Sequence, residues 1–387
     1  MKKNKKKTRV MLLCPFYPPN LGGVETHLQL LTDYLVKEKY QVFVLTYKPL
    51  ITRASYKSYE KKKNLRIWRF WWFGQVWFDK VTPYPPFQFF YIIPGLLAYT
   101  FIWMIKNHRQ IEVIHAHGFA AAWIARMVSF IFPGKKKVVS THFIYKKIKP
   151  GGLYGLVFKW VMNGFDKILL ISQKSSQEFK ALGLNPDKME IFYHWLDLNK
   201  FKPKNKKRFQ KKLKIPSQAK LTVLFVGRLL KMKGIFRLLE VAKELPKEIV
   251  FIIVGSGVDE EQLKTKAKGV KNFLMVGLKT RRQVVDYLAA CDFLILPSLT
   301  EEAQPMVVME ALACGRPVVT TNKGSAKEMF HSKVGLAIEP TKSNLKRVIL
   351  DFYRHPEKLE NMKLEARRFA KTKFSSKNAK IITAHYQ

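Results

Sequence analysis

Short apolar runs, each followed by a polar loop and then by a helical pattern, recur along most of the chain. The runs that predict buried strands cover residues 9–14, 41–46, 111–114, 138–141, 167–171, 190–193, 221–226, 250–255, 273–277 and 293–296. Strands that alternate with helices in this way predict parallel sheets with helices packed on both faces. The repetition in both halves of the chain predicts two such domains.

The most informative stretch covers residues 293–321. An apolar strand, 293–296, is followed by a polar loop, 298–304. Pro305 suits the first turn of a helix, where a missing N–H costs nothing. That helix is expected to run to about Cys314 and to end at Gly315, and residues 317–321 begin the next strand.

Two carboxylates, Glu302 and Glu310, lie in this stretch with seven residues between them. Glu310 belongs to a helical segment that is otherwise Met, Val, Ala and Leu, where a carboxylate is costly unless its oxygens have partners. One interpretation is a Glu on a solvated helix face. The other is a pair of acceptors for the hydroxyls of one polar ligand at the carboxyl edge of a parallel sheet. The spacing alone leaves both open.

The sequence from Glu302 through Glu310-Ala311 to the segment ACGRPVV (313–319) resembles the signature of glycosyltransferase family 4. These are retaining enzymes built from two Rossmann-like domains, the GT-B architecture. The resemblance implies that Glu302 contacts the donor sugar and that Glu310 holds the ribose of the nucleotide. The chain departs from the family at 303–305, where Ala-Gln-Pro replaces Gly-Phe-Gly and Pro305 offers no backbone N–H.

Two further groups of residues suit the binding of phosphate. Gly22 and Gly23 open a helix after the first strand, where free N–H groups point outward. The segment 22–25 resembles the Gly-Gly-Val-Glu sequence of the family, which implies that the acceptor or the donor diphosphate lies beside it. Arg228 and Lys233 lie between a strand and a helix N-terminus, and both side chains suit a diphosphate. They resemble the diphosphate-binding pair of the family.

Histidines follow two neighbouring strands: His115 and His117 end the strand near 111–114, and His142 follows 138–141. A lone histidine there is more often structural, but three at carboxyl ends indicate a ligand-binding edge. The resemblance places His117 near the donor sugar and the acceptor, so His117 and Glu302 are the expected catalytic residues. Carboxylate or thiolate partners for a metal are missing nearby, and no Asp-x-Asp pair occurs, so we expect no metal and no cofactor.

The chain has 387 residues and a formal net charge of +42, and its length suits two domains. Such a charge implies an anionic partner: nucleic acid, phosphate ligands or an acidic membrane face. Nucleic-acid-binding motifs are missing from the sequence, so we expect no nucleic acid. Three cysteines without paired or metal-like spacing indicate a reducing compartment.

Aromatic residues concentrate between residues 65 and 105, where 15 occur. The uncharged run 89–105, interrupted by Pro94-Gly95, predicts a buried helix from about residue 96 to 106. The cluster Trp68–Phe78, with Arg66, Arg69 and Lys80 around it, suits either the headgroup level of a membrane or a flap over an acceptor pocket. The segment 202–214 holds eight basic residues and no acid, which suits a solvated linker or helix face, or else contact with an anionic membrane.

The sequence therefore predicts an α/β protein with two doubly wound Rossmann-like domains that face each other across a cleft. The first comprises 1–196 together with 373–387, and the second 197–372. The resemblance implies a retaining transferase that moves a mannose- or glucose-type hexose from a GDP- or UDP-sugar to a hydroxyl of a lipid-linked or glycan acceptor. Its expected place is the cytoplasm, peripheral to the inner face of an anionic membrane. The alternative is a non-catalytic protein that binds a nucleotide sugar or scaffolds a membrane complex.

Overall fold

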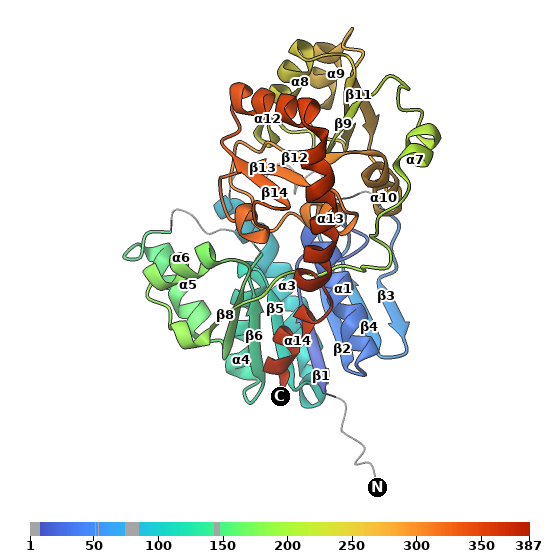
Figure 1. The fold of residues 1–387 in the computed structure, drawn as a ribbon. Helices are drawn as coiled ribbons and strands as arrows, with labels where there is room; N and C mark the ends of the chain where they lie inside the picture. The colour runs from blue at the N-terminus through green and yellow to red at the C-terminus, as the bar shows by residue number, and fades with distance from the viewer. Residues whose placement is uncertain (1–7, 51, 53, 74–84, 143–147) are drawn as a thin grey trace. The chain divides into compact units, whose positions relative to one another are not determined.

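The computed structural model describes residues 8–50, 52, 54–73, 85–142 and 148–387, and these residues form two compact units. Unit 1 comprises Met1–His194 and Ser376–Gln387, and unit 2 comprises Trp195–Ser375. The chain thus completes the sheet of unit 1, builds the whole of unit 2, and returns its last helix to unit 1 (Figure 1).

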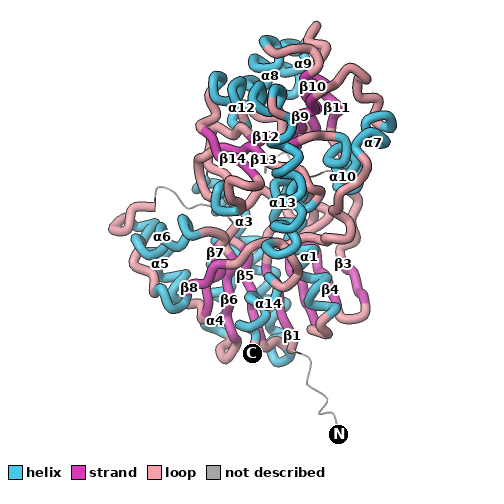
Figure 2. Tube along the Cα trace, in the orientation of Figure 1, coloured by secondary structure: helices cyan, strands magenta, loops and turns pink. Residues whose placement is uncertain are grey.

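Unit 1 is built on an eight-stranded sheet with the order β3-β4-β2-β1-β5-β6-β7-β8 (Figure 2). All neighbouring strands are parallel except β3 and β4, which form an antiparallel edge. The central strands are apolar on both faces, as buried parallel strands require. The strands are β1 (Arg9–Leu13), β2 (Gln41–Tyr47), β3 (Tyr59–Lys62), β4 (Leu65–Phe70), β5 (Val113–His117), β6 (Lys136–Ser140), β7 (Lys167–Leu170) and β8 (Met189–Ile191).

The helices of unit 1 follow the strands in the expected alternation. They are α1 (Gly23–Lys37), α3 (Pro85–Asn107), α4 (Phe119–Ile131), α5 (Leu153–Asn163), α6 (Gln173–Ala181) and α14 (Asn378–Thr383), with short turns η1 (His108–Gln110), η2 (Pro186–Lys188) and η5 (Ala384–Tyr386). The inner sides of α3, α4 and α5 share one apolar core with the sheet. At the end of the chain, the hydroxyl of Tyr386 lies 2.6 Å from Nδ1 of His115 on β5.

Unit 2 contains a six-stranded, fully parallel sheet with the order β11-β10-β9-β12-β13-β14. Its strands are β9 (Leu221–Val226), β10 (Ile249–Val254), β11 (Phe273–Gly277), β12 (Phe293–Leu296), β13 (Val318–Thr321) and β14 (Gly335–Ile338). Its helices are α7 (Lys206–Lys212), α8 (Ile235–Glu244), α9 (Glu260–Ala267), α10 (Arg281–Ala290), α11 (Met306–Ala313), α12 (Lys342–Arg354) and α13 (Pro356–Lys373), with turns η3 (Lys231–Lys233) and η4 (Ala326–Met329). The prediction of two doubly wound Rossmann-like domains is confirmed.

Helix α3 differs from its prediction in length. The sequence predicted a helix over 96–106 with a break at Pro94-Gly95, but the helix runs unbroken over Pro85–Asn107. Gly95 is needed there for close packing, because a Cβ at this position would lie 2.3 Å from the indole of Trp72. The glycine therefore serves the contact between α3 and the segment after β4, and does not end the helix.

The aromatic cluster Trp68–Phe78 divides between the interior and the surface. Trp68 packs between Phe43 and Trp103, and Trp72 stacks on Tyr47 while its Nε1–H donates to the carbonyl of Tyr91. Trp71 and Phe73 are exposed, and the rest of the cluster, including Trp77, lies outside the described residues. Trp68 and Trp72 are partly buried and pack against the core of unit 1.

The basic segment 202–214 folds against unit 2. Its lysines on and before α7 form ion pairs with two acids: Lys206 with Asp292 at 2.6 Å, and Lys204 and Lys212 with Asp286 at 3.4 and 2.7 Å. Burial alone would raise the pKa of the Asp292 carboxyl, but Lys206 and Lys363 outweigh it and hold this pKa below its usual value. Part of the segment is therefore the helix α7, and three of its lysines are ion-paired with acids of unit 2.

Candidate active site

The predicted donor-binding residues of unit 2 gather at the carboxyl edge of its sheet. Strands β9 and β12 are hydrogen-bonded neighbours at the centre of the sheet. Arg228 follows the end of β9, and Ser298 and Glu302 follow the end of β12. This edge, at the centre of a doubly wound sheet, is where such folds bind ligands.

The loops after β9 and β12 contact each other through main-chain atoms. The N–H of Leu299 donates to the carbonyl of Met232 at 2.8 Å. Gly234, which begins α8, has a φ of +74°, and a Cβ there would lie 1.9 Å from the carbonyl oxygen of Pro297. Only glycine permits both the left-handed backbone and this approach. The contact brings Lys233 next to the Glu302 loop.

Lys233 and Glu302 form an ion pair at the centre of this edge. Nζ of Lys233 lies 2.5 Å from Oε1 of Glu302, and the hydroxyl of Ser298 donates to the same oxygen. The main chain of Glu302 is also held, because its carbonyl accepts from the N–H groups of Ser325 and Ala326 at 2.8 and 3.1 Å. Ser298 was not predicted, since a serine four residues before a loop carboxylate gives no distinctive signal.

Arg228 lies in the same loop as Lys233 and its side chain is exposed. The loop is anchored on β10, because the N–H of Gly227 donates to Val254 and that of Leu229 to Ser256. The structure therefore presents a guanidinium and an ammonium group from one fixed loop. Two cations so placed can neutralise the charge of a diphosphate.

Glu310 is buried on α11 and forms an ion pair with Arg281, the first residue of α10. Nε of Arg281 donates to Oε1 of Glu310 at 2.8 Å, and the guanidinium lies over the ring of Phe201 at 5.0 Å. Nη2 of Arg281 is a buried atom for which the described part of the chain provides no hydrogen-bond partner. The partner that the sequence required for Glu310 is thus Arg281, whose role was not predicted.

The first predicted phosphate site lies at the start of helix α1. Helix α1 begins at Gly23, directly after Gly22. Oε2 of Glu25 lies 2.2 Å from the position that a Cβ of Gly22 would occupy. The carboxylate of the chain itself therefore covers this helix N-terminus, which favours negative charge. An anionic ligand would have to share this N-terminus with Glu25.

The carboxyl edge of the unit 1 sheet carries a cluster of buried histidines. Nδ1 of His117 lies 3.1 Å from Nε2 of His142, and the ring of His115 lies 4.1 Å from that of His117. His27 from α1 stacks on His194 at 4.1 Å and lies 5.4 Å from His142. The structure thus unites the three predicted histidines with two that were not predicted to join them. We call these five residues the histidine cluster.

The histidine cluster is uncharged near neutral pH. Burial lowers the pKa of His115 and His142 to about 3, and burial together with neighbouring histidines lowers the pKa of His27, His117 and His194. Nε2 of His117 is a buried atom for which the described residues provide no hydrogen-bond partner. Neutral His117 can therefore offer one ring nitrogen to a ligand hydroxyl.

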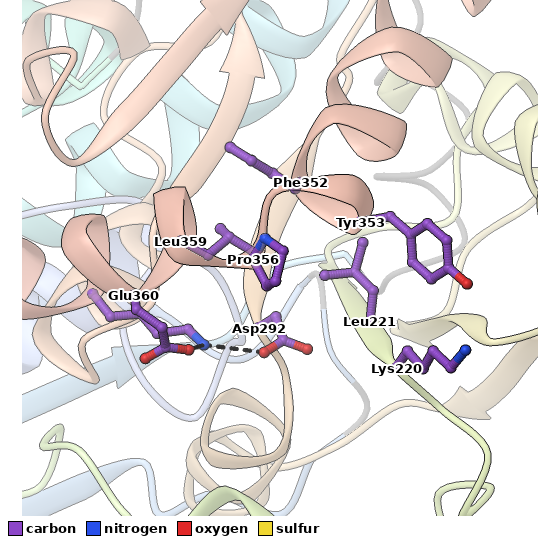
Figure 3. Close-up of a pocket in the computed structure, with 9 residues that line it drawn as sticks. Lys220, Leu221, Asp292, Phe352, Tyr353, Pro356, Leu359 and Glu360 are labelled. Carbon is purple, nitrogen blue, oxygen red and sulfur yellow. Dashed lines mark hydrogen bonds and ion pairs between the residues drawn. The ribbon is translucent and has the colours of Figure 1, made fainter.

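A hollow of about 190 Å³ lies at the opposite edge of the unit 2 sheet (Figure 3). It is lined by the start of β9 and β12, at Leu221 and Asp292, and by residues of α12 and α13. Asp292 in its wall is already bonded to lysines and to the N–H of Thr222. The hollow is therefore a packing gap beside a satisfied carboxylate, away from the predicted site. Among the described residues, no group of three or more His, Cys, Asp or Glu side chains is arranged to hold a metal ion.

Two family profiles match consecutive parts of the chain. The profile described as Glycosyltransferase Family 4 matches residues 21–200, and the one described as Glycosyl transferases group 1 matches residues 205–369. The chain belongs to glycosyltransferase family 4. The ion pairs at the carboxyl edge of unit 2 lie within the second match.

Two relatives of known sequence and one solved structure are similar to this chain. A protein named as a teichuronic acid biosynthesis glycosyltransferase, TuaC of Bacillus subtilis, is 29% identical over 64% of this chain and 62% of its own length. A relative from Arabidopsis thaliana, named as part of a phosphatidylinositol N-acetylglucosaminyltransferase, is 25% identical over 89% of this chain and 74% of its own. HepE of Anabaena, solved with UDP-glucose, has a TM-score of 0.74 at 17% identity and covers 97% of this chain and 99% of its own.

Proposed function

We propose that this protein transfers a hexose from a nucleotide-diphosphate sugar to an acceptor hydroxyl with retention of configuration. The observation that carries this proposal is the arrangement at the carboxyl edge of unit 2. There Lys233 and Glu302 form one ion pair, Arg281 and Glu310 form another, and Arg228 extends from the same loop as Lys233. The same edge of one sheet thus carries basic side chains that can bind a diphosphate and carboxylates that can accept hydrogen bonds from sugar hydroxyls.

In this proposal Arg228 and Lys233 stabilise the leaving diphosphate. An ammonium group has three N–H donors, so Lys233 can keep its bond to Glu302 and still bind phosphate oxygens. The acceptor oxygen bonds to the anomeric carbon as the sugar–phosphate bond breaks, and the acceptor proton passes to the departing phosphate. The protein then contributes positioning and charge stabilisation, which are large terms in group transfer.

The two carboxylates divide the rest of the donor. Glu302 is held by Lys233, by Ser298 and through its own main chain. Its carboxylate accepts hydrogen bonds from hydroxyls of the sugar. Glu310 is held by Arg281, and its carboxylate accepts hydrogen bonds from the ribose hydroxyls of the nucleotide. His117 supplies an uncharged ring nitrogen to the sugar or the acceptor. Gly22 and Gly23 bring the main chain close to the acceptor or the diphosphate.

The proposed donor is a UDP- or GDP-sugar and the proposed acceptor is a lipid-linked or glycan hydroxyl. A UDP-sugar is supported by HepE, which was solved with UDP-glucose. A lipid acceptor is supported by the Arabidopsis relative, whose name specifies phosphatidylinositol, and a glycan acceptor by TuaC. We place the enzyme in the cytoplasm at the inner face of an anionic membrane. The alternative remains a protein that binds a nucleotide sugar or scaffolds a membrane complex without catalysis.

A transfer assay tests this proposal. Purified protein is incubated with labelled UDP- and GDP-sugars and a lipid extract, and product and free sugar are measured. We expect transfer by the natural protein, a loss of at least about a hundredfold in Glu302→Gln, and no loss in the matched control Glu240→Gln, which changes an exposed residue of α8. Because Arg228 and Lys233 supply positive charge, the rate should persist in EDTA. Donor binding without transfer or hydrolysis would favour the non-catalytic alternative.

A further inference from the structure

The outer side of the helices α3, α4 and α5 in unit 1 is apolar, although their inner sides already fill the core. Large apolar side chains are exposed on all three helices. They are Phe90, Ile102 and Ile105 of α3, Phe130 and Ile131 of α4, and Leu153, Tyr154, Leu156 and Trp160 of α5. We call these residues the outer apolar face.

Ring contacts make this face continuous across the helices. Phe89 of α3 meets Trp123 of α4 with ring centroids 6.4 Å apart, and Phe101 meets Phe132 at 5.8 Å. Phe130 of α4 stacks on Trp160 of α5 at 5.8 Å. Large continuous apolar patches on a protein surface mark sites of interaction with another protein or a membrane.

Helix α5 shows most clearly that a second apolar environment is expected. From Leu153 to Met162 its only charged residue is Lys159. Phe158, Val161 and Met162 face the core, yet Leu153 is 80% exposed and Leu156 and Trp160 continue the same outer stripe. A helix that is apolar on all sides is normally buried on all sides. An apolar partner is therefore expected on the outer stripe.

The charge around this face selects the kind of partner. Among the described residues between Pro85 and Phe165 there are eight lysines and arginines and one acid, Glu112. Glu112 is neutralised by Arg9, whose main-chain N–H donates to it at 2.8 Å. Arg126 lies over the rings of Phe130 and Trp160 at 4.7 and 5.3 Å. The partner is consequently apolar inside and negatively charged at its surface.

We propose that the outer apolar face docks unit 1 on an anionic lipid bilayer, with α3 and α5 lying in the headgroup region. In the described part of the chain, α3 is the one helix long and apolar enough to cross a membrane by length and composition. Its inner residues Ile92, Ile93, Leu96 and Met104 are buried in unit 1, so it lies along the surface and does not span it.

This inference rests on the proposed lipid-linked acceptor and adds the surface that meets the lipid. Helices α4 and α5 follow β5 and β6, whose carboxyl ends carry His117 and His142. The N-terminal ends of α4 and α5, with Leu153 and Tyr154, therefore lie at the edge that carries the histidine cluster. A membrane on this face would present a lipid-linked hydroxyl beside that edge.

Vesicle sedimentation tests the docking surface. The full-length protein is mixed with phosphatidylcholine vesicles that contain or lack phosphatidylglycerol, at low and high salt. We expect binding to the anionic vesicles that weakens but persists at high salt. The combined change Leu153→Ser, Leu156→Ser and Trp160→Ser should weaken binding at least about tenfold at both salt concentrations. Because these side chains point outward, the variant should keep its thermal unfolding midpoint.

Matched variants distinguish binding through this face from binding caused by the overall positive charge or by exposed apolar residues elsewhere. Val258→Ser with Leu364→Ser removes two exposed apolar residues from unit 2 and should leave binding unchanged. Lys106→Gln, Arg109→Gln and Lys149→Gln, all exposed near the face, should weaken low-salt binding by about fivefold per residue. The same change at Lys243, Lys247 and Lys268 of unit 2 should weaken it less.

Three results would overturn the inference. They are no binding to anionic vesicles, equal binding to neutral and anionic vesicles, and a dimer that the α5 variant dissociates, which would make the face a contact between copies of the chain. UDP binding, measured on the same samples, should be unchanged in the α5 variant. A protein that transfers sugar to a soluble acceptor but ignores vesicles would refute the docking surface alone. One that binds vesicles but transfers nothing would refute the proposed function alone.

Discussion

At the scale of single residues, the two carboxylates of the candidate site are held by different cations. Glu302 is fixed by Lys233 and Ser298, and Glu310 by Arg281. A carboxylate with a charged partner keeps one orientation, so its remaining acceptor positions are directed before a ligand arrives. Substitution of Glu302 and substitution of Glu310 should therefore impair different parts of donor binding.

We predict that Glu310→Gln weakens UDP or GDP binding by at least about tenfold, because a charge-assisted bond to the ribose is lost. Glu302→Gln should leave affinity for the bare nucleotide within about twofold while it abolishes transfer. Isothermal titration calorimetry gives both affinities. If the two variants lose the same affinity for the bare nucleotide, the division between sugar and ribose is wrong.

The sequence identified these carboxylates but not their partners. Glu302 and Glu310 stand in one short stretch and Arg228 and Lys233 in another, and both stretches resemble motifs of the family. Arg281 lies 29 residues from Glu310, and the pairing exists because α10 and α11 pack against the same sheet. His27 joins the other histidines for a similar reason, since α1 places it over strands that are distant in sequence. Contacts of this kind depend on tertiary packing, which a single sequence does not encode locally.

At the scale of elements, the apolar runs predicted the central strands of both sheets, because strands buried on both faces are almost continuously apolar. The predicted helix before Gly315 is also observed as α11, Met306–Ala313, with Pro305 directly before it and Gly315 at a φ of +68° after its last turn. The edge strands β3 and β4 were not predicted, because β3 is short and mostly polar and β4 alternates buried with less buried residues instead of forming a continuous apolar run. Helix α3 was predicted too short, because Pro94-Gly95 was interpreted as a break in the helix. Gly95 in fact allows close contact with the indole of Trp72.

The histidine cluster makes unit 1 sensitive to acid. In the folded state burial holds the pKa of all five histidines below 6.5, and in the unfolded state they titrate near 6.5. The unfolded state therefore binds more protons as pH falls below about 6.5, and stability falls with it until the folded pKa is reached. Between pH 7 and pH 5 each such histidine should cost about 2 kcal/mol of unfolding free energy.

Urea unfolding at pH 7 and pH 5 measures this effect. Seven of the eight tryptophans lie in unit 1, so tryptophan fluorescence follows that unit. The loss on acidification should be smaller in His142→Asn by about 2 kcal/mol, and unchanged in His355→Asn, which removes an exposed histidine of unit 2. A loss that is the same in both variants would show that carboxylates, not the histidine cluster, govern acid stability.

At the scale of the whole molecule, the charge of +42 has more than one use. Part of it is internal: Lys204, Lys206 and Lys212 neutralise Asp286 and Asp292 of unit 2. A second part borders the outer apolar face, where Lys106, Arg109 and Lys149 are exposed. A third part, Arg228 and Lys233, belongs to the proposed diphosphate site. The net charge predicted an anionic partner, and only the structure divides it among these regions.

The most direct test of the central proposal is a calorimetric titration of UDP and GDP into the natural protein, Arg228→Ala, Lys233→Ala and the matched control Lys231→Ala. Lys231 is an exposed lysine of the same loop, so it controls for general charge. We predict that one of the two nucleotides binds, that Arg228→Ala and Lys233→Ala each weaken it at least about tenfold, and that Lys231→Ala leaves it within about twofold. Unchanged affinity in both Arg228→Ala and Lys233→Ala would contradict the diphosphate site and the proposed donor with it.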